Sequence, residues 1–306
     1  MNKTIAITTS SFAKYDKTPL LNLTKAGIAY SLNPYGRKLT AEEVVELAKD
    51  VDGLIAGTES LNEIVLSKLH NLKVISRCGV GIDNIDLTEA EKIGVKVLNT
   101  PNAPTDAVAE LTICMILDLL RHVTTMDRMI RHGTWKKHMG NLLRGKKVGI
   151  IGFGRIGQAV ARLLLTFGSD IIYCDENIIT TSLSATQVSM SELLSSADII
   201  TIHVSNTTQG RHIIARQELE QMKKGTWLIN TSRGGMVDEK SLLQSLKNKH
   251  ISGAALDVFE SEPYDGSLTQ LDNVLLTPHI GSYTIESRID MEMQATFNLI
   301  NELKNK

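Results

Sequence analysis

Three glycines with the spacing G-x-G-x-x-G point to the most specific chemistry in this chain. Gly152, Gly154 and Gly157 follow the apolar run VGII and open the helical pattern QAVARLLLTFG. The first glycine permits a tight turn, the second lets the backbone approach a pyrophosphate, and the third lets the helix pack closely on a strand. The helix then directs its N-terminal amides at the phosphates. This spacing predicts a dinucleotide site.

Asp175 discriminates between the two nicotinamide dinucleotides. It ends the apolar run DIIYC and lies 18 residues beyond Gly157 (175 − 157 = 18). A carboxylate at this place accepts hydrogen bonds from the adenosine ribose and would repel a 2′-phosphate. The sequence therefore predicts NAD rather than NADP as the cofactor.

Four polar clusters follow apolar runs further along the chain. They are His203, the triplet Thr231-Ser232-Arg233, Asp257, and the segment 277–281, which contains His279. In an open parallel sheet, ligands bind beyond the carboxyl ends of the strands. We therefore expect these side chains to gather on the cofactor side of one sheet.

The elements that position these residues are short apolar runs that alternate with helical patterns, in two series. The first series is TIAITT, GIAYSL, GLIAG, LKVIS and VKVLN, and the second is KVGII, DIIYC, ADIITIH, TWLIN, ISGAAL and NVLLT. Such alternation predicts parallel sheets with crossover helices. We expect an α/β protein of two doubly wound domains. Residues 1–100 plus 282–306 should form a flavodoxin-like substrate domain, and residues 101–281 a Rossmann NAD-binding domain.

Several helices have specific signals. Thr40 with Glu43 and Thr88 with Glu91 are spaced as capping boxes. Residues 105–123 form a helical pattern that is apolar on nearly every face, which predicts burial between domains or subunits and, with it, a homodimer. The last helix should bury an apolar face at three- and four-residue steps. That face comprises Ile285, Ile289, Met293, Phe297 and Ile300.

Composition excludes several functional classes. The 306 residues carry 33 Lys+Arg against 34 Asp+Glu, a net charge of −1, so no basic surplus suggests a nucleic-acid partner. Cys78, Cys114 and Cys174 fit neither a disulfide framework nor a zinc site, and we expect Cys114 and Cys174 to be core thiols and no metal to be bound. No signal peptide or membrane-spanning run is recognisable, which predicts a soluble cytoplasmic protein without a membrane partner.

Longer motifs in the chain resemble those of a known protein family. NTSRGGMVD, LDVFESEP and NVLLTPHIGS follow VGIIGFGRIGQ in that order, and RCGVGIDNIDL and TPNAPTDAVAELT precede it. The chain resembles the D-2-hydroxyacid dehydrogenases over nearly its whole length, especially their phosphoglycerate dehydrogenase branch. The resemblance implies an NAD-dependent enzyme that moves a hydride between nicotinamide and C2 of a 2-hydroxy or 2-oxo acid.

The resemblance also implies a catalytic set of Arg233, Glu262 and His279. Histidine, with an intrinsic pKa near neutrality, suits a proton donor and acceptor beside the substrate oxygen. Glu262 would pair with the imidazole and fix its tautomer. Arg233 offers a planar fork of donors to the substrate carboxylate and carbonyl.

The remaining family contacts divide into two groups. The cofactor group comprises Gly152, Gly154, Arg155, Ile156, Gly157, Asp175, His203, Thr207, Thr231, Ser232, Asp257 and Gly281. The substrate group is the loop Arg77, Cys78, Gly79 and Val80, whose amides are expected to form an anion nest. Ser205 stands where the family usually has a proline, which affects the neighbouring Thr207.

The substrate itself remains open among several acids. The overall resemblance favours 3-phosphoglycerate, with Arg77, Lys136 and Lys137 as candidate phosphate cations. Against it, Gly57 stands where phosphoglycerate dehydrogenases commonly place an arginine. Glyoxylate, hydroxypyruvate or another small 2-oxo acid is the next hypothesis. Two further alternatives are an NAD(H)-sensing regulatory protein on the same scaffold and a dehydrogenase of phosphite or another oxyanion.

Overall fold

The structure is a computed structural model and describes residues 3–204 and 212–304. The chain divides into two compact units. Unit 1 comprises Met1–Pro104 and Ser282–Lys306, and unit 2 comprises Thr105–Gly281. Unit 2 begins at Thr105, the first residue of a long helix, whereas the sequence expectation begins it at residue 101.

Unit 1 contains a parallel sheet with the strand order β2-β1-β3-β4-β5. This is the order of the flavodoxin-like doubly wound fold, as expected. The apolar runs of the first series all form strands of this sheet. The strands are β1 (Thr4–Ile7), β2 (Ala29–Leu32), β3 (Gly53–Ala56), β4 (Val74–Arg77) and β5 (Lys96–Leu98).

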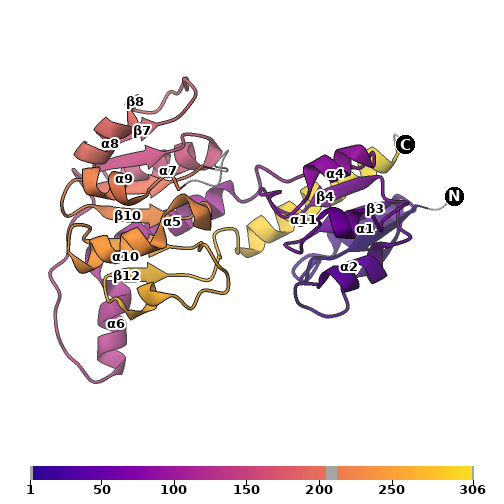
Figure 1. Ribbon diagram of the computed structural model, residues 1–306, viewed down its shortest axis with the longest axis horizontal. Helices are drawn as coiled ribbons and strands as arrows, with labels where there is room; N and C mark the ends of the chain where they lie inside the picture. The colour runs from indigo at the N-terminus through magenta and orange to yellow at the C-terminus, as the bar shows by residue number, and fades with distance from the viewer. Residues whose placement is uncertain (1–2, 205–211, 305–306) are drawn as a thin grey trace. The chain divides into compact units, whose positions relative to one another are not determined.

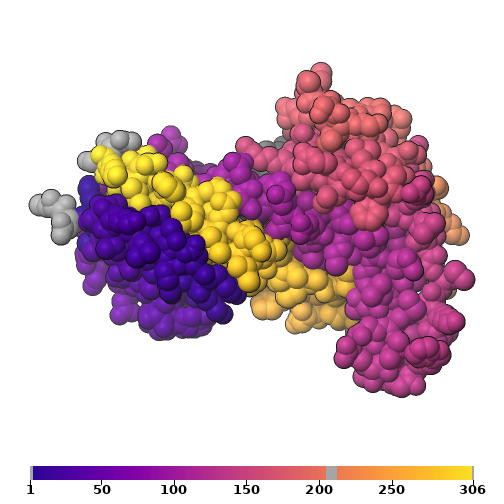
Figure 2. All heavy atoms as spheres, turned by 180° about the vertical axis from the view of Figure 1, so that it is seen from behind, coloured from indigo at the N-terminus to yellow at the C-terminus, as the bar shows by residue number. Residues whose placement is uncertain are grey.

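Helices cover both faces of this sheet. Helices α2 (Ala41–Ala48), α3 (Glu63–Leu66) and α4 (Leu87–Lys92) share one apolar cluster with the sheet. Helices α1 (Thr18–Lys25) and α11 (Ile285–Lys304) share the other. Alternate residues of β1 serve the two clusters, because successive strand side chains point to opposite faces. Figure 2 shows α11, from the end of the chain, lying along the N-terminal segment of the same unit.

The buried face of α11 agrees only in part with the predicted one. Ile300 is buried, and Ile289 and Met293 are half-buried, whereas Ile285 and Phe297 are 52% and 53% exposed. The fully buried apolar residues that the prediction left out are Met291, Ala295, Leu299 and Leu303. The face of α11 that contacts β3 and β4 includes the small residue Ala295 and the buried Glu292. Hydropathy alone therefore underestimates how deeply this face is buried. Glu292 is satisfied by the backbone amide of Ala13 at 2.8 Å and by the Arg288 guanidinium at 2.8 Å.

Unit 2 contains a larger parallel sheet with the order β12-β11-β10-β9-β6-β7-β8. Numbered from β6 and read from β8, the order is 3-2-1-4-5-6, with β12 added as a seventh strand, which is the Rossmann arrangement. All the second-series runs are strands, and β8 is an addition that the sequence did not predict. The strands are β6 (Lys147–Ile151), β7 (Asp170–Cys174), β8 (Ala185–Gln187), β9 (Ile199–Ile202), β10 (Trp227–Asn230), β11 (Gly253–Leu256) and β12 (Val274–Leu276).

Helices again form two layers on this sheet (Figure 1). Helices α5 (Thr105–Arg121) and α7 (Arg155–Thr166) pack together over one face. Helices α8 (Met190–Ser196), α9 (Arg216–Gln221) and α10 (Glu239–Lys247) cover the other. The remaining elements are α6 (Val123–Arg131) and the short helices η1 (Gly234–Met236) and η2 (Ser267–Gln270).

The structure tests the two predicted capping boxes and the predicted burial of Cys114. The capping box of Thr40 and Glu43 is confirmed at the start of α2. The box expected at Thr88 is wrong, because Asp86 caps α4 and accepts the Glu89 amide, and an aspartate two residues earlier competes for the same turn. Cys114 is exposed and is therefore not a core thiol. No helix in the described part of the chain is long and apolar enough to span a membrane.

Candidate active site

The glycine loop of unit 2 has the geometry that its spacing predicts. Gly152 follows β6 with a φ of +88°, and an added Cβ would lie 2.6 Å from the His203 carbonyl oxygen. A Cβ on Gly157 would lie 2.2 Å from the Gly152 carbonyl oxygen, so this helix can approach its strand only with glycine there. Around Gly154 nothing lies within 4 Å of an added Cβ. The middle glycine is thus open to an incoming group.

The N-terminus of α7 faces this opening without a cap from its own side chains. Gly154 is the N-cap residue and provides no side-chain hydrogen bond to the first turn, which contains Arg155, Ile156 and Gly157. Helix N-terminal amides that lack internal partners bind anions, and the macrodipole favours negative charge there. The loop and the helix therefore fit the pyrophosphate of a dinucleotide.

Asp175 lies at the end of β7, next to the glycine loop. Its Oδ2 accepts a hydrogen bond from the Phe153 amide at 2.7 Å, and its Oδ1 accepts one from the Asn177 amide at 2.9 Å. The carboxylate is half-buried and so remains accessible to a ribose. It therefore ties the second strand to the loop between Gly152 and Gly154, in addition to the ribose contact predicted for it.

Two polar residues lie at the ends of the central strands. His203 follows β9, and its Nε2 lies 2.9 Å from the Thr201 hydroxyl, while its Nδ1 is buried without a partner among the described residues. Burial lowers the pKa of His203 to about 3, so the ring is neutral. The Thr231 hydroxyl lies 3.0 Å from that of Thr112 on α5. Thr207 and Ser205 lie outside the described residues.

His279 and Glu262 form a pair, as expected from the resemblance. The His279 Nδ1 lies 2.9 Å from Glu262 Oε2, and Glu262 Oε1 accepts the Phe259 amide at 3.1 Å. The side chains are 51% and 38% exposed, so both can reach a ligand. Because a carboxylate accepts from Nδ1–H, the pair leaves the other imidazole nitrogen for proton exchange.

Asp257 fixes the loop that carries His279. It is 1% exposed and accepts three hydrogen bonds: from the Thr277 hydroxyl at 2.5 Å, the Ile280 amide at 2.8 Å and the Gly281 amide at 2.7 Å. Burial raises the pKa of Asp257, although these hydrogen bonds act to lower it. The resemblance implied a cofactor contact for Asp257; the structure adds this positioning of His279.

Arg233 lies on the neighbouring loop, in an extended conformation with a φ of −144°. Its Nη1 donates to the Ser232 carbonyl at 2.8 Å, and Asn230 braces the turn by donating to the Arg233 carbonyl at 2.9 Å. Asn230 also accepts from the Ser232 amide and hydroxyl. Sequence reasoning missed Asn230, although it is the first residue of the quoted motif NTSRGGMVD.

The Arg233 and Glu262 segments are in direct backbone contact. A Cβ added to Gly234 would lie 1.8 Å from the Phe259 carbonyl oxygen, so only glycine permits this approach. Phe259 in turn donates to Glu262. Unit 2 therefore brings together the segments that carry the three catalytic candidates.

The predicted substrate loop follows β4 in unit 1. Here the Cys78 amide donates to the Ala56 carbonyl at 2.9 Å and the Gly79 amide to the Thr100 hydroxyl at 2.8 Å. The Arg77 guanidinium contacts the Cys78 carbonyl. The Cys78 side chain points into the core, and burial raises the pKa of its thiol to about 11. Two of the amides expected in the anion nest are therefore used within the unit, and Arg77 belongs to β4, so Val80 is the remaining candidate of the predicted group.

Comparison with known proteins identifies the family. A model described as the NAD binding domain of D-isomer specific 2-hydroxyacid dehydrogenases matches residues 113–281. The chain belongs to this family. It is therefore an oxidoreductase with NAD as its cofactor, and the matched region coincides with the Rossmann unit.

Individual relatives agree on the family and differ in substrate. The chain is 42% identical over 278 residues to the glyoxylate reductase of Thermofilum pendens, covering 87% of this chain and 82% of that relative. It is 42% identical over 259 residues to the D-3-phosphoglycerate dehydrogenase of Methanocaldococcus jannaschii, covering 82% of this chain but 49% of that relative. The TT0316 protein of Thermus thermophilus has a similar structure, with a TM-score of 0.91, 33% identity and coverage of 99% and 97%.

Proposed function

We propose that this dehydrogenase reduces a small unphosphorylated 2-oxo acid, glyoxylate or hydroxypyruvate, to the D-2-hydroxy acid. The catalytic part rests on the His279–Glu262 pair. His279 in its protonated form donates to the substrate oxygen as charge develops there, and Glu262 stabilises the imidazolium and holds the ring. Arg233 polarises the carbonyl and binds the carboxylate. NADH, when bound, supplies the hydride.

The main support for an unphosphorylated substrate is the environment of Gly57 in unit 1. Glu59 is buried, 1% exposed, and accepts a hydrogen bond from the Gly57 amide at 2.9 Å. A Cβ on Gly57 would lie 2.8 Å from Glu59 Oε2, so a larger residue at position 57 would displace this carboxylate. In place of a cation that could hold a phosphate, this loop contains a buried carboxyl group.

The position of Glu59 makes this carboxyl group relevant to the proposed substrate loop. Ala56 and Arg77 are partners at the ends of the adjacent strands β3 and β4, so the loops that follow them start side by side. Glu59 also accepts from the Thr8 hydroxyl, which ties its loop to the end of β1. A phosphate approaching the loop after β3 would meet the Glu59 carboxyl group, while the Arg77 guanidinium at the end of β4 is turned to the Cys78 carbonyl. We take this arrangement as support for an unphosphorylated substrate.

3-Phosphoglycerate, which the sequence resemblance favoured, is our second candidate. Its support is the similarity to the Methanocaldococcus jannaschii relative, which this chain matches over about half of that protein's length. The glyoxylate reductase of Thermofilum pendens is matched over 82% of its length, which supports the first candidate.

We further propose that the enzyme works in the cytoplasm as a homodimer. Its ligands besides NAD would be small 2-hydroxy and 2-oxo acids.

A matched pair of substrates tests this proposal. Hydroxypyruvate and 3-phosphohydroxypyruvate differ only by the phosphate, and NADH absorbance reports the turnover of both, with glyoxylate alongside. We expect kcat/KM to be at least about tenfold higher for the unphosphorylated acid, which corresponds to ~1.4 kcal/mol. Glu59→Gln should bring the kcat/KM values of the two acids closer together. Glu63→Gln, on α3 of the same unit, should leave their ratio unchanged. A higher kcat/KM for the phosphorylated acid would overturn the proposal.

A further inference from the structure

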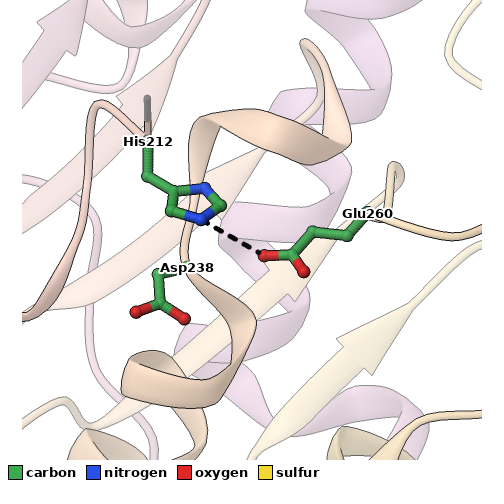
Figure 3. A group of neighbouring side chains, drawn as sticks. All are labelled: His212, Asp238 and Glu260. Carbon is green, nitrogen blue, oxygen red and sulfur yellow. Dashed lines mark ion pairs between the residues drawn. The ribbon is translucent and has the colours of Figure 1, made fainter. Parts of the chain in front are cut away.

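A second cluster of reactive side chains lies in unit 2, apart from the His279–Glu262 pair. His212, Asp238 and Glu260 come from three separate segments and lie close together, with His212 facing Glu260 (Figure 3). One ligand atom from each lies within 4.8 Å of those of the other two. Among the described residues this is the group whose donors could surround a metal ion. None of the three has a role in the proposed reaction.

The hydrogen bonding of His212 points to a ligand. Its Nδ1 lies 3.0 Å from the Gly235 carbonyl oxygen. Because a carbonyl only accepts, Nδ1 must carry a proton, so Nε2 is the ring nitrogen that can bind an ion. Metal-binding histidines are usually held in this way, with the second nitrogen donating to a backbone carbonyl or carboxylate. Nε2 lies 3.7 Å from Glu260 Oε1, which is too far for a hydrogen bond.

The two carboxylates are held in place before any ion binds. Asp238 caps α10: its Oδ1 accepts the Lys240 and Ser241 amides at 3.1 and 3.2 Å, and its Oδ2 accepts the Ser241 hydroxyl at 2.5 Å. Glu260 Oε1 accepts the Glu239 amide at 3.3 Å, and the Glu260 amide donates to Glu239 Oε1 at 2.7 Å. Glu260 also lies opposite the His212 imidazole, with 3.7 Å between Oε1 and Nε2. The cluster therefore combines negative charge with fixed oxygen ligands.

The donor set selects the type of ion. One imidazole with two carboxylates suits Zn²⁺ and its neighbours Co²⁺ and Ni²⁺, whereas Ca²⁺ and Mg²⁺ prefer oxygen ligands alone. Zinc bonds to nitrogen and oxygen are about 2.0–2.2 Å long, so two ligands of one tetrahedral ion lie roughly 3.4 Å apart. The 3.7 Å between His212 Nε2 and Glu260 Oε1 is close to that separation.

We propose that His212, Asp238 and Glu260 bind a divalent transition-metal ion, with Zn²⁺ the best match. The ion would tie the segment around Glu260 to the start of α10. Gly235, which orients His212, is two residues from Arg233, and Glu260 is two residues from Glu262. The ion would therefore brace the segments that carry two catalytic candidates without contacting the substrate.

Calorimetric titration of the metal-free, tag-free protein with Zn²⁺ tests this site, and thermal unfolding gives a second measurement. We expect one saturable site per chain and a rise in Tm with added Zn²⁺, because an ion that binds only the folded state stabilises it. His212→Ala and Glu260→Gln should weaken binding by at least about tenfold, the loss that even an indirect metal contact can cause. Asp238→Asn should also weaken binding while keeping the helix cap, since asparagine caps as well as aspartate.

Two controls separate this site from others. His70→Ala removes an exposed histidine of unit 1 and should leave the affinity unchanged. His279→Ala should also leave it unchanged, which excludes adventitious zinc at the catalytic imidazole. Absence of saturable binding, unchanged affinity in His212→Ala, or binding lost only in His279→Ala would each overturn the proposal. Because these measurements do not depend on turnover, they stand apart from the test of the substrate.

Discussion

At the scale of single residues, the proposed chemistry depends on the orientation of one imidazole. Glu262 accepts from one nitrogen of His279, and Asp257 holds the loop on both sides of it. We expect His279→Ala to lower kcat by about 10²-fold or more, because a positioned acid–base group contributes that much. His132→Ala, which removes an exposed histidine of the same unit, is the matched control. Near-normal turnover in His279→Ala would contradict the assignment.

Glu262 should contribute less to the rate than His279 does. Glu262→Gln keeps an acceptor beside His279 Nδ1, whereas Glu262→Ala removes it. We therefore expect kcat to fall less in Glu262→Gln than in Glu262→Ala, and less in both than in His279→Ala. Measurement of kcat for NADH oxidation at saturating substrate tests this order. A kcat in Glu262→Ala equal to that of the unaltered enzyme would exclude the pairing as a functional one.

We expect Asp175 to determine the choice of cofactor through its charge as well as its position. Asp175→Ala removes the carboxylate and also the acceptor of the Phe153 amide, so it loosens the glycine loop. Asp175→Asn keeps one acceptor and removes only the charge. We expect both variants to bind NAD more weakly and to narrow the gap in kcat/KM between NADH and NADPH. Equal use of the two cofactors by the unaltered enzyme would refute the electrostatic argument.

At the scale of elements, an aspartate stabilises the first strand of each sheet in the same way. Asp198 precedes β9, accepts the Lys147 amide of β6 at 3.0 Å and pairs with Lys223 at 2.6 Å. In unit 1, Asp52 precedes β3, accepts the Thr4 amide of β1 at 2.9 Å and pairs with Lys73 at 2.6 Å. Each carboxylate thus connects two adjacent parallel strands, in addition to the backbone hydrogen bonds between them.

The pKa of Asp198 converts this contact into a pH prediction. Burial acts to raise the pKa of Asp198, but the hydrogen bonds from Lys223 and Lys147 outweigh it and hold the pKa below its ordinary value of 3.8. A lowered folded-state pKa stabilises the fold above the unfolded pKa, and this stabilisation is lost as the pH falls through the folded value. Asp198→Asn should cost about 1–2 kcal/mol at neutral pH. The cost should shrink progressively as the pH falls below the ordinary pKa of the carboxyl.

Urea denaturation followed by tryptophan fluorescence measures this cost, since Trp135 and Trp227 both belong to unit 2. Asp52→Asn is the matched control because it alters the equivalent contact in unit 1, and it should leave the fluorescence transition of unit 2 unchanged. A pH-independent loss in Asp198→Asn would exclude the ionised carboxylate as its cause.

At the scale of the whole molecule, we place the proposed dimer interface on α6 and the segment after it, whereas the sequence hypothesis placed it on residues 105–123. The apolar residues of α5 pack within unit 2, whereas α6 buries none of its residues. Trp135 and Met139, just beyond α6, are 82% and 94% exposed. Figure 1 shows α6 extending away from the layers of its unit. An apolar surface of this kind marks an interface, and we expect a second copy of the chain to cover it.

Trp135→Lys should therefore shift the protein from dimer to monomer in sedimentation velocity at micromolar concentration. Ile178→Lys, which alters an apolar residue that is 93% exposed elsewhere in unit 2, should leave the dimer intact. A monomer in the unaltered protein would refute the dimer, and equal effects of the two variants would refute this interface.

Much of the fold and the cofactor site could be predicted from the sequence because their signals are local. The apolar runs specify the strands, and the spacing of Gly152, Gly154 and Gly157 specifies the turn into α7, since each depends on a few neighbouring residues. The family motifs supplied the His279–Glu262 pair, which spans 17 residues and has no local signature.

Tertiary structure decided what depends on residues distant in the chain. Asp257 becomes the anchor of the His279 loop only because β11 and β12 are neighbours, and Gly57 is restricted only because Glu59 turns back onto it. The buried face of α11 is selected by β3 and β4, more than 200 residues earlier, rather than by its own hydropathy. His212 meets Glu260 across 48 residues (260 − 212 = 48). Sequence patterns describe neighbours along the chain, whereas such contacts form only when the sheet brings separate loops to one edge.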